Sequence, residues 1–234
     1  MPGDASANAP MREARFASKF HVKQSDPDRQ RALALVPLSK DVEARLAIYV
    51  DLLARWRTIT NLISATSFSE VWTRHIADSA QLLPLVPEAR RWVDLGSGAG
   101  FPGLVIAIVL ADVEGARVHC IESDRRKCAF LREVVRATGA PAEIHAERVE
   151  DVAPEALLPV DAATARAFAP LPRLIELAKV WIVHGAVGIF PRGRTAESQL
   201  EALPDAPDLS IDVLASRLDP ESAIVRVRSI SKAS

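Results

Sequence analysis

The stretch Arg91-Trp-Val-Asp-Leu-Gly-Ser-Gly-Ala-Gly-Phe-Pro-Gly-Leu-Val-Ile-Ala-Ile-Val-Leu110 decides how the rest of the chain is organised. Its residues up to Leu95 have the pattern of a short buried strand, and the apolar run 104–110 is typical of the buried part of a helix. Glycine occupies four positions between them, namely Gly96, Gly98, Gly100 and Gly103. Glycine adopts positive φ and lets a ligand approach the backbone, and Pro102 suits the first turn of a helix. A strand, a glycine turn and a helix in this order present a helix N-terminus to a nucleotide-like ligand.

Two classes of cofactor compete for this turn. Gly98-Ala-Gly100-Phe-Pro-Gly103 matches the dinucleotide pattern G-x-G-x-x-G, but the predicted strand ends before it. Counted from the strand, the pattern is Asp94-x-Gly96-x-Gly98-x-Gly100, and an acidic residue that closes the strand is typical of S-adenosylmethionine (SAM) methyltransferases. A carboxylate attracts the ammonium of SAM and repels the pyrophosphate of a dinucleotide. The pattern therefore favours SAM, with a tight turn that binds no ligand as the alternative.

Length and composition limit the function classes. A chain of 234 residues can hold one α/β domain and an appendage, and 49% hydrophobic with 25% charged residues is typical of a globular protein. The net charge of −1 means that any binding to RNA needs a local basic patch. The two cysteines lack the spacing of metal ligands, and no apolar run approaches the roughly 18 residues of a membrane span. We therefore expect a cytoplasmic protein with no metal site and no membrane association.

The N-terminal part divides into two predicted regions. Residues 1–31 are rich in Ala, Pro, Asp and basic residues and lack apolar periodicity, so we expect a mostly disordered extension. Residues 32–88 have helical patterns and predict a helical cap. Ser39 caps a predicted helix that runs to about Thr58, and Ser67-x-x-Glu70 has the spacing of a capping box for a second helix.

The second predicted helix carries the polar group Arg74-His75-x-x-Asp78-Ser79. Arg74 and Asp78 are four residues apart and His75 and Asp78 three, so these side chains share one face of a helix. From the residues alone, a surface ion pair worth a few tenths of a kcal/mol is the simpler interpretation.

Residues 89–234 alternate predicted strands and helices and form the predicted core domain. Further strands are predicted at 117–121, 142–145, 161–166, 185–190, 209–214 and 223–227, and helices at 124–137 and 171–181. With the strand of the opening stretch this makes seven strands. Helices between the early strands indicate an α/β fold whose sheet is mostly parallel and ends in an antiparallel hairpin.

Three groups of side chains in this domain have chemistry that suits a nucleotide cofactor and RNA. Glu122 ends the second strand, where an acid accepts hydrogen bonds from the ribose hydroxyls of an adenosine. Arg166 could bind a carboxylate or phosphate in a bidentate manner, with a structural ion pair as the alternative. Phe168 could stack on a flipped-out base, with core packing as the alternative. Candidates for an RNA-binding patch, as opposed to ordinary surface charge, are Arg125, Arg126, Lys127, Arg192 and Arg194.

Several motifs, in this order along the chain, resemble those of the bacterial small-subunit ribosomal RNA guanine-N7 methyltransferases, the RsmG or GidB family. They run from about Ser39 to the C-terminus. The matching pieces are Asn61-Leu, Arg74-His75-x-x-Asp78-Ser79, Asp94-x-Gly-x-Gly-x-Gly-x-Pro-Gly103, Arg148-Val-Glu150, Arg166-Ala-Phe168 and Arg192-Gly193. The glycine motif alone indicates SAM binding, whereas the Arg74 and Arg166 groups carry the narrower resemblance.

The resemblance implies a class I SAM-dependent methyltransferase fold, Rossmann-like with a seven-stranded sheet, behind an N-terminal helical cap. It implies methylation of N7 of guanine 527 in 16S ribosomal RNA of the small subunit, and we expect the protein to act as a monomer. Implied cofactor contacts are Gly96, Gly98, Phe101, Val149, Glu150 and Arg166, with Asp94 and Glu122 in support. No catalytic residue is certain, and the positioning candidates are Arg166, Phe168, His75 and Asp78.

The chemistry of guanine N7 agrees with this resemblance. N7 has an in-plane lone pair and no proton, so it attacks a methyl group without a general base, and the enzyme needs to supply position and orientation. Three rivals stay open from the sequence. They are a SAM enzyme with a small-molecule or protein substrate, a non-catalytic RNA- or nucleotide-binding protein, and an NAD-binding protein.

Overall fold

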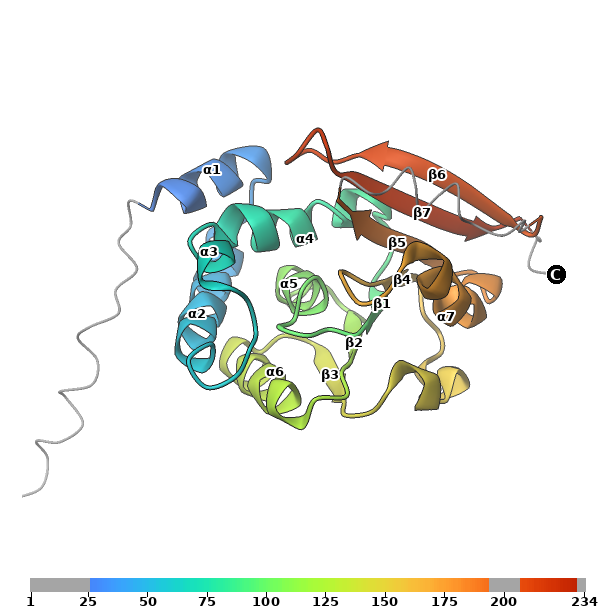
Figure 1. Cartoon of the computed structure of the whole chain (residues 1–234), viewed down its shortest axis with the longest axis horizontal. Helices are drawn as coiled ribbons and strands as arrows, with labels where there is room; N and C mark the ends of the chain where they lie inside the picture. The colour runs from blue at the N-terminus through green and yellow to red at the C-terminus, as the bar shows by residue number, and fades with distance from the viewer. Residues whose placement is uncertain (1–25, 194–206, 231–234) are drawn as a thin grey trace, which may run out of the picture.

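A single seven-stranded sheet forms the centre of the computed structural model, which describes residues 26–193 and 207–230 (Figure 1). The strands are β1 (Arg91–Leu95), β2 (Arg117–Ile121), β3 (Ala142–His145), β4 (Ala162–Thr164), β5 (Val187–Arg192), β6 (Leu209–Ala215) and β7 (Ala223–Ser229). Their order in the sheet is β3-β2-β1-β4-β5-β7-β6. The first five strands are parallel, and β7 pairs antiparallel with both β5 and β6. The predicted α/β fold with a late antiparallel hairpin is confirmed.

The strand order creates a crevice at the carboxyl end of β1. From β1 the chain steps outward to β2 and β3 on one side, and it then returns to β4 and β5 on the other. Ligands of open α/β sheets bind where the order reverses in this way, beyond the carboxyl ends of the strands. The glycine turn follows β1 directly, so the fold places it at this crevice.

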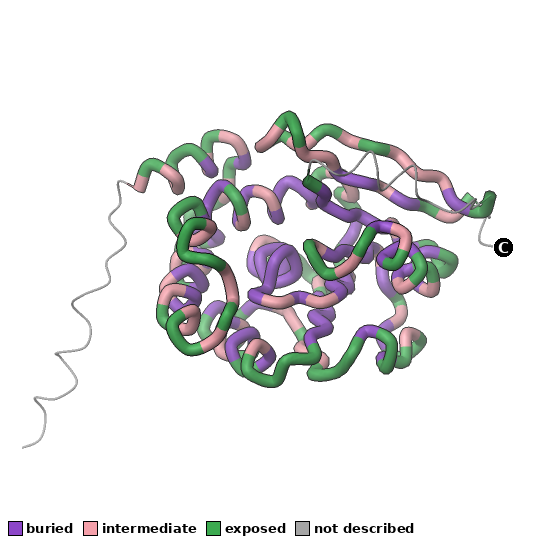
Figure 2. Tube along the Cα trace, viewed as in Figure 1, coloured by how far each residue is buried: buried purple, intermediate pink, exposed green. Residues whose placement is uncertain are grey.

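Two hydrophobic cores cover the two faces of the sheet. Successive strand residues point to opposite faces, and in β1 Trp92 packs into one core while Val93 and Leu95 pack into the other. The helices α2 (Lys40–Trp56), α5 (Gly103–Val109) and α6 (Arg125–Thr138) cover the first face, and α7 (Leu171–Val183) covers the second (Figure 1). Figure 2 shows that the central strands and the inner sides of these helices are mostly buried, which makes the sheet a rigid base for the crevice.

The N-terminal region is helical, as predicted, but it begins earlier than expected. Residues 1–25 lie outside the described residues, whereas α1 (Pro27–Leu35) occupies part of the segment that we expected to be disordered. Asp26 caps α1, and Asp28 accepts hydrogen bonds from the backbone N–H of Trp72 and from the hydroxyl of Thr73. These bonds hold α1 against the following helices, so the ordered cap begins before residue 32.

The second predicted helix differs from the expectation. Ser64, not Ser67, caps a short helix α3 (Ala65–Phe68), and the next turn is the π-helix η2 (Trp72–Ala77), followed by α4 (Asp78–Ala80) and the 3₁₀ turn η3 (Leu83–Leu85). The predicted capping box at Ser67-x-x-Glu70 is therefore wrong. A π-turn carries an extra residue, which changes which side chains share a face and often marks a functional site.

Several strands and helices have different ends from those predicted, and β4, β5 and α7 differ the most. β4 is shorter than expected, α7 runs on to Val183, and β5 starts later and includes Pro191 and Arg192, which we had placed after the strand. The cause is tertiary, because Pro191 and Arg192 lie opposite Ile224 and Ala223 of β7. Pairing with β7 thus extends β5 by two residues toward the carboxyl end of the sheet, where the crevice lies.

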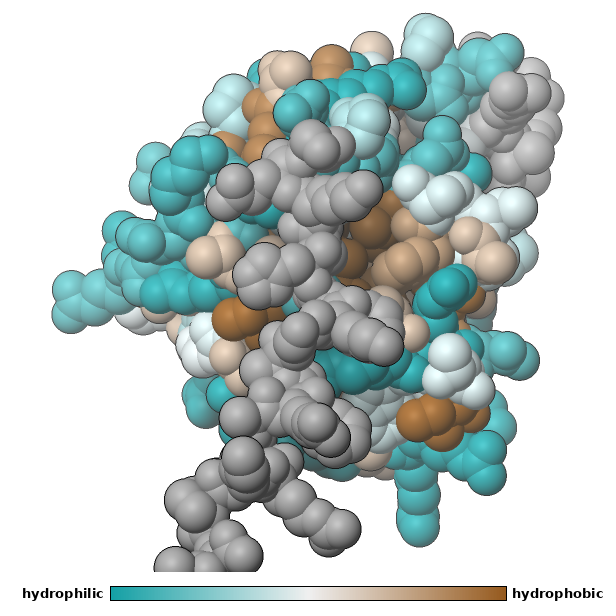
Figure 3. All heavy atoms as spheres, turned by 90° about the vertical axis from the view of Figure 1, so that its left-hand side faces the viewer, coloured by the Kyte–Doolittle hydropathy of each residue, from teal (hydrophilic) through white to brown (hydrophobic). Residues whose placement is uncertain are grey.

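Within residues 26–193 and 207–230, no helix has the length and apolar character that a membrane crossing requires. On the face in Figure 3, hydrophilic residues make up most of the visible surface, and hydrophobic residues form small separate groups between them.

Candidate cofactor and substrate site

The glycine turn after β1 has the backbone geometry that the sequence predicted. Gly96, Gly98 and Gly100 have φ of 69°, 57° and 94°, in the left-handed region that favours glycine. The hydroxyl of Tyr49, which lies on α2, donates to the backbone carbonyl of Ala99 and ties the N-terminal helices to the turn. The two residues are 50 positions apart in the chain, so no local sequence pattern indicates this contact.

Asp94 lies beneath the turn. Its side chain is fully buried, Oδ2 accepts from the backbone N–H of Gly103 at 3.1 Å, and Oδ1 has no partner in the described part of the chain. A Cβ on Gly103 would lie 2.6 Å from Oδ2, so glycine is required for this close approach. Burial raises the pKa of Asp94 to about 6. Asp94 therefore accepts a hydrogen bond from the first residue of α5. It is not among the residues that line the pocket described next.

A pocket of about 560 Å³ opens beyond the carboxyl ends of β1, β2 and β4. Its volume falls within the roughly 300–1,000 Å³ of small-molecule sites. The structure brings together in its walls seven of the eight residues predicted to contact a cofactor: Gly96, Gly98, Phe101, Glu122, Val149, Glu150 and Arg166. The sequence prediction of one convergent site is supported by this placement, with Asp94 as the residue left outside.

Glu122 closes β2 and faces the turn. One carboxylate oxygen accepts from the N–H of Gly98 at 2.8 Å, and the other accepts from the N–H of Asp124 at 2.8 Å. A carboxylate has about four lone-pair positions. Each oxygen can therefore hold its backbone donor and still accept a bond from a hydroxyl group in the pocket.

Arg166 links the end of β4 to the π-turn. Its Nη2 meets Nδ1 of His75 at 2.6 Å, and its Nη1 donates to the carbonyl of Arg74 at 3.1 Å and to Oδ2 of Asp78 at 3.4 Å. The guanidinium lies 5.0 Å from the centre of the Phe101 ring, and His75 stacks on the same ring at 4.7 Å. The four positioning and cofactor candidates Arg166, His75, Asp78 and Phe101 therefore form one cluster.

The π-turn also corrects the predicted ion pair. Arg74 pairs with Glu70 at 3.5 Å, and Asp78 pairs with Arg166 instead of Arg74. Because the turn is wider than an α-helix, Asp78 points to the sheet while Arg74 stays at the surface. The simpler interpretation from the residues alone, a surface ion pair between Arg74 and Asp78, is wrong.

His75 is held as a neutral side chain. The guanidinium donor occupies Nδ1, so Nε2 carries the proton and bonds the hydroxyl of Ser67. Burial and the charges of Arg166 and Arg74 lower the pKa of His75 to about 3. The role of Ser67 was missed because its partner lies eight residues away across an irregular segment.

This pKa predicts a pH-dependent loss of stability. In the unfolded chain His75 titrates near 6.5, so between pH 6.5 and 3 the unfolded chain binds the proton and the folded chain does not. Acid therefore favours unfolding. We expect wild type to lose about 1.4 kcal/mol per pH unit relative to His75→Gln as pH falls from 6 to 4. Chemical denaturation at several pH values measures this difference. The raised pKa of Asp94 makes acid favour the folded state, but this effect is the same in wild type and in His75→Gln, so it cancels in the comparison. Equal dependence of the two stabilities on pH would contradict the prediction.

Phe168 belongs to the pocket and not to the core. Its side chain is 40% exposed, which decides against the core-packing alternative. The ring lies directly over Gly96, where any Cβ would overlap it. The residue between Arg166 and Phe168, Ala167, has a φ of 52°, a strained value that turns the backbone at the pocket wall.

The predicted RNA-binding residues do not form one patch. Arg125, Arg126 and Lys127 lie at the start of α6 and line a separate pocket with Arg57. Arg192 is buried at the end of β5, and the strands β1 and β4 separate β5 from β2. Arg194 lies outside the described residues.

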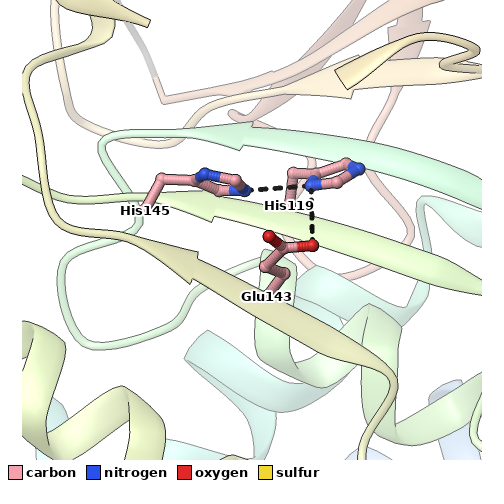
Figure 4. A group of neighbouring side chains, drawn as sticks. All are labelled: His119, Glu143 and His145. Carbon is pink, nitrogen blue, oxygen red and sulfur yellow. Dashed lines mark hydrogen bonds and ion pairs between the residues drawn. The ribbon is translucent and has the colours of Figure 1, made fainter. Parts of the chain in front are cut away.

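The remaining reactive side chains are already engaged or buried. Cys120 and Cys128 are buried, and burial raises the pKa of both thiols. Figure 4 shows His119, Glu143 and His145 gathered on β2 and β3. Nδ1 of His119 and Nε2 of His145 share a hydrogen bond of 2.9 Å, and Glu143 pairs with Arg117 at 3.3 Å. These groups satisfy one another.

Solved structures with this fold include several methyltransferases. A putative O-methyltransferase from Klebsiella pneumoniae superposes with a TM-score of 0.57 at 14% identity, over 87% of this chain and 96% of that one. A mutant of MtNAS crystallised with SAM gives a TM-score of 0.52 at 15% identity, over 87% of this chain and 76% of that one. At these identities the likeness concerns the fold, and it confirms the predicted class I methyltransferase architecture.

Sequence relatives are much closer. A protein of Methylobacterium sp. (strain 4-46) named ribosomal RNA small subunit methyltransferase G is 47% identical over 87% of this chain and 96% of its own length. A protein of the same name from Nitrobacter hamburgensis is 49% identical over 75% of this chain and 68% of its own length. The family described as GidB, rRNA small subunit methyltransferase G, matches residues 42–216. The chain therefore belongs to the GidB family of small-subunit ribosomal RNA methyltransferases.

Proposed function

We propose that this protein transfers the methyl group of SAM to N7 of guanine 527 in 16S ribosomal RNA. The observation that carries the proposal is one pocket in which the Glu122 carboxylate, the glycine turn and Arg166 face the space beside the exposed Phe168 ring. Membership of the methyltransferase family supplies the reaction class. The choice of N7 rests on the chemistry below, and guanine 527 rests on the family resemblance.

The residues of the pocket fit SAM. Glu122 has lone pairs left for two ribose hydroxyls after it accepts from Gly98 and Asp124. A Cβ at Gly98 would touch only the carbonyl of Gly96, at 3.8 Å, so the turn presents open backbone to the ligand. We assign the sugar to Glu122, the adenine to Val149 and Glu150 on the 3₁₀ turn η4 (Val149–Asp151), and the carboxylate to Arg166. When bound, SAM would supply a methyl group on a sulfonium: a lone pair can attack the methyl carbon without further activation, because the C–S bond breaks and a neutral thioether leaves.

Guanine N7 suits a site that offers position and no base. His75 has both ring nitrogens engaged and a pKa near 3, so it does not take up a proton at neutral pH. The thiols are buried and protonated. N7 has no proton to remove, and correct alignment alone lowers a barrier by several kcal/mol. We propose that the exposed face of Phe168 stacks on the guanine and sets that alignment.

Base mapping tests the whole proposal. Purified 30S subunits from cells that lack this protein are incubated with the protein and labelled SAM, and the modified base is then mapped. Methylation at N7 of guanine 527 is the expected result. Transfer to another base, or to a small molecule or a protein, would reject the assigned substrate, and a thermal shift with NAD but not SAM would reject the cofactor.

Glu122→Gln is expected to weaken SAM binding by about tenfold to a hundredfold, since a hydrogen bond to a charged group is worth about 1.5–3 kcal/mol. An amide has one oxygen, so it cannot accept from both Gly98 and Asp124 and also serve the ribose. Calorimetric titration with SAM measures the effect. Glu114→Gln, at an exposed acid before the amino end of β2, is the matched control and should bind SAM as wild type does. Equal affinity of both variants would remove Glu122 from the site.

We further propose that the protein acts as a monomer in the cytoplasm, where its ribosomal substrate is found. Exposed large apolar side chains in the described ranges lie at separate places along the chain: Ile48, Ile59, Val113, Phe168, Val183, Val213 and Ile230. Stable dimers need a contiguous apolar patch instead. Light scattering of the purified protein tests the oligomeric state.

A further inference from the structure

A second pocket lies on the other side of Arg166. Its volume is about 260 Å³, several times the roughly 30 Å³ of one water molecule, so it has room for a phosphodiester group. Its walls come from the π-turn, the end of β5 and the turn between β6 and β7, with Arg74, Arg166 and Arg192 as the cations and Asp78 and Asp219 as the acids. Arg166 is the one residue that the structure assigns to the walls of both this pocket and the larger one.

Arg192 is the unusual member of this second pocket. The residue is only 9% exposed, and Nη1 donates to the backbone carbonyl of Ala169 at 3.2 Å. Nε and Nη2 are buried and have no hydrogen-bond partner among the residues that the structure describes. These two nitrogens form one edge of the guanidinium, the fork that binds two oxygens of a carboxylate or phosphate at once.

Among the residues that the structure describes, no carboxylate forms an ion pair with the fork. Asp78 already pairs with Arg166 and Gln81, and Asp219 accepts from the backbone N–H of Glu221 and the hydroxyl of Ser222. Burial lowers the pKa of Arg192, and no carboxylate contributes to that shift. A buried guanidinium in which two of the three nitrogens lack an acceptor destabilises the fold, because the lost hydration of Nε and Nη2 is not replaced. The pocket therefore keeps a cationic fork that the fold itself does not need.

We propose that Arg192 binds a phosphate of the substrate RNA at the target nucleotide and thereby places the base beside the methyl donor. This rests on the proposed function, because it assigns the smaller pocket to the same substrate. The larger pocket and Phe168 would receive the base, and the backbone phosphate would lie beyond Arg166 in the smaller pocket. A fixed phosphate orients a flipped-out base, and the unpaired Nε and Nη2 offer that phosphate two donors side by side.

Two variants test the proposal. Arg192→Met removes the fork and keeps an apolar stem, and Arg228→Met is the matched control, because Arg228 is exposed and Asp212 retains Arg226 as a partner. Inorganic phosphate, at matched ionic strength, should raise the melting temperature of wild type and of the control but not of Arg192→Met. Without phosphate, Arg192→Met should melt at the wild-type temperature or above it, since a buried charge has been removed.

The same variants are compared in methyl transfer to 30S subunits. For Arg192→Met we expect kcat/KM for the RNA to fall about tenfold to a hundredfold with SAM affinity unchanged. The slope of log affinity against log salt should become shallower by about 0.7, the value for one phosphate contact on a single strand. Should the Met variant not fold, Arg192→Lys serves instead, because an ammonium keeps the charge and loses the fork.

The outcomes separate this proposal from the proposed function. Wild-type transfer rates in Arg192→Met, with an unchanged salt slope, would overturn the phosphate site and leave the methyltransferase intact. Weaker SAM binding in that variant would overturn it as well, since the fork would then serve the cofactor. A lower melting temperature with a parallel loss of activity would mean a structural role. The opposite result is also informative. If phosphate raises the melting temperature only when Arg192 is present, but the protein does not methylate guanine N7, the phosphate site stands and the proposed function is rejected.

Discussion

Arg166→Ala is expected to lower the rate of methyl transfer by at least about a hundredfold, the size of effect that a displacement of about 1 Å produces at a reacting centre. Arg166 holds His75, Asp78 and the carbonyl of Arg74, all on the segment η2–α4, and it covers the Phe101 ring. Without it the wall shared by the two pockets is lost. Single-turnover transfer to 30S subunits at saturating SAM measures the rate.

The same substitution should also destabilise the protein by about 1.5–3 kcal/mol, because it removes hydrogen bonds to charged groups from a partly buried ion pair. Asp78 would remain in a site where burial already raises its pKa. The assay is therefore run well below the melting temperature of the variant. Arg91→Ala is the control, because it removes another arginine–aspartate pair, with Asp161, at the amino end of the sheet. A loss of methyl-transfer rate in Arg91→Ala, or a wild-type rate in Arg166→Ala, would contradict the role assigned to Arg166.

The sequence was sufficient for those parts of the site that depend on local backbone. The glycine turn needs positive φ at Gly96, Gly98 and Gly100, and only a few residue types allow that, so the pattern was readable. Glu122 was found because it ends an alternating strand at a fixed position after the turn. The seven strands were found from their apolar periodicity, although the ends of β4 and β5 were displaced.

The parts that depend on distant contacts were not readable. The π-turn η2 is stabilised by Asp28 of α1 and by the reach of His75 to Ser67, and neither contact has a local sequence pattern. Arg192 looked like a surface cation because its burial arises from the pairing of β5 with β7. Ion pairs chosen by helical spacing failed for the same reason, since Asp78 found its partner 88 residues away.

Gly96→Ala is expected to weaken SAM binding by about a hundredfold, equivalent to roughly 2.7 kcal/mol. A Cβ here adds the strain of a left-handed φ, about 1–2 kcal/mol, and overlaps the Phe168 ring, which must swing out of the pocket wall. Gly139→Ala is a close control, since Gly139 has a φ of 67° and a Cβ there would meet nothing within 4 Å. Both variants should therefore lose similar stability, and only Gly96→Ala should lose SAM affinity and methyl transfer.

The double variant Gly96→Ala with Phe168→Ala distinguishes the effect of backbone strain at position 96 from the effect of the overlap between the new Cβ and the Phe168 ring. Removing the ring relieves the overlap, so SAM affinity should partly return, whereas methyl transfer should stay low because the surface on which the guanine stacks is gone. Loss of affinity in Gly139→Ala equal to that in Gly96→Ala would show that backbone strain alone explains the effect. Full recovery of transfer in the double variant would mean that Phe168 covers the turn without contacting the base.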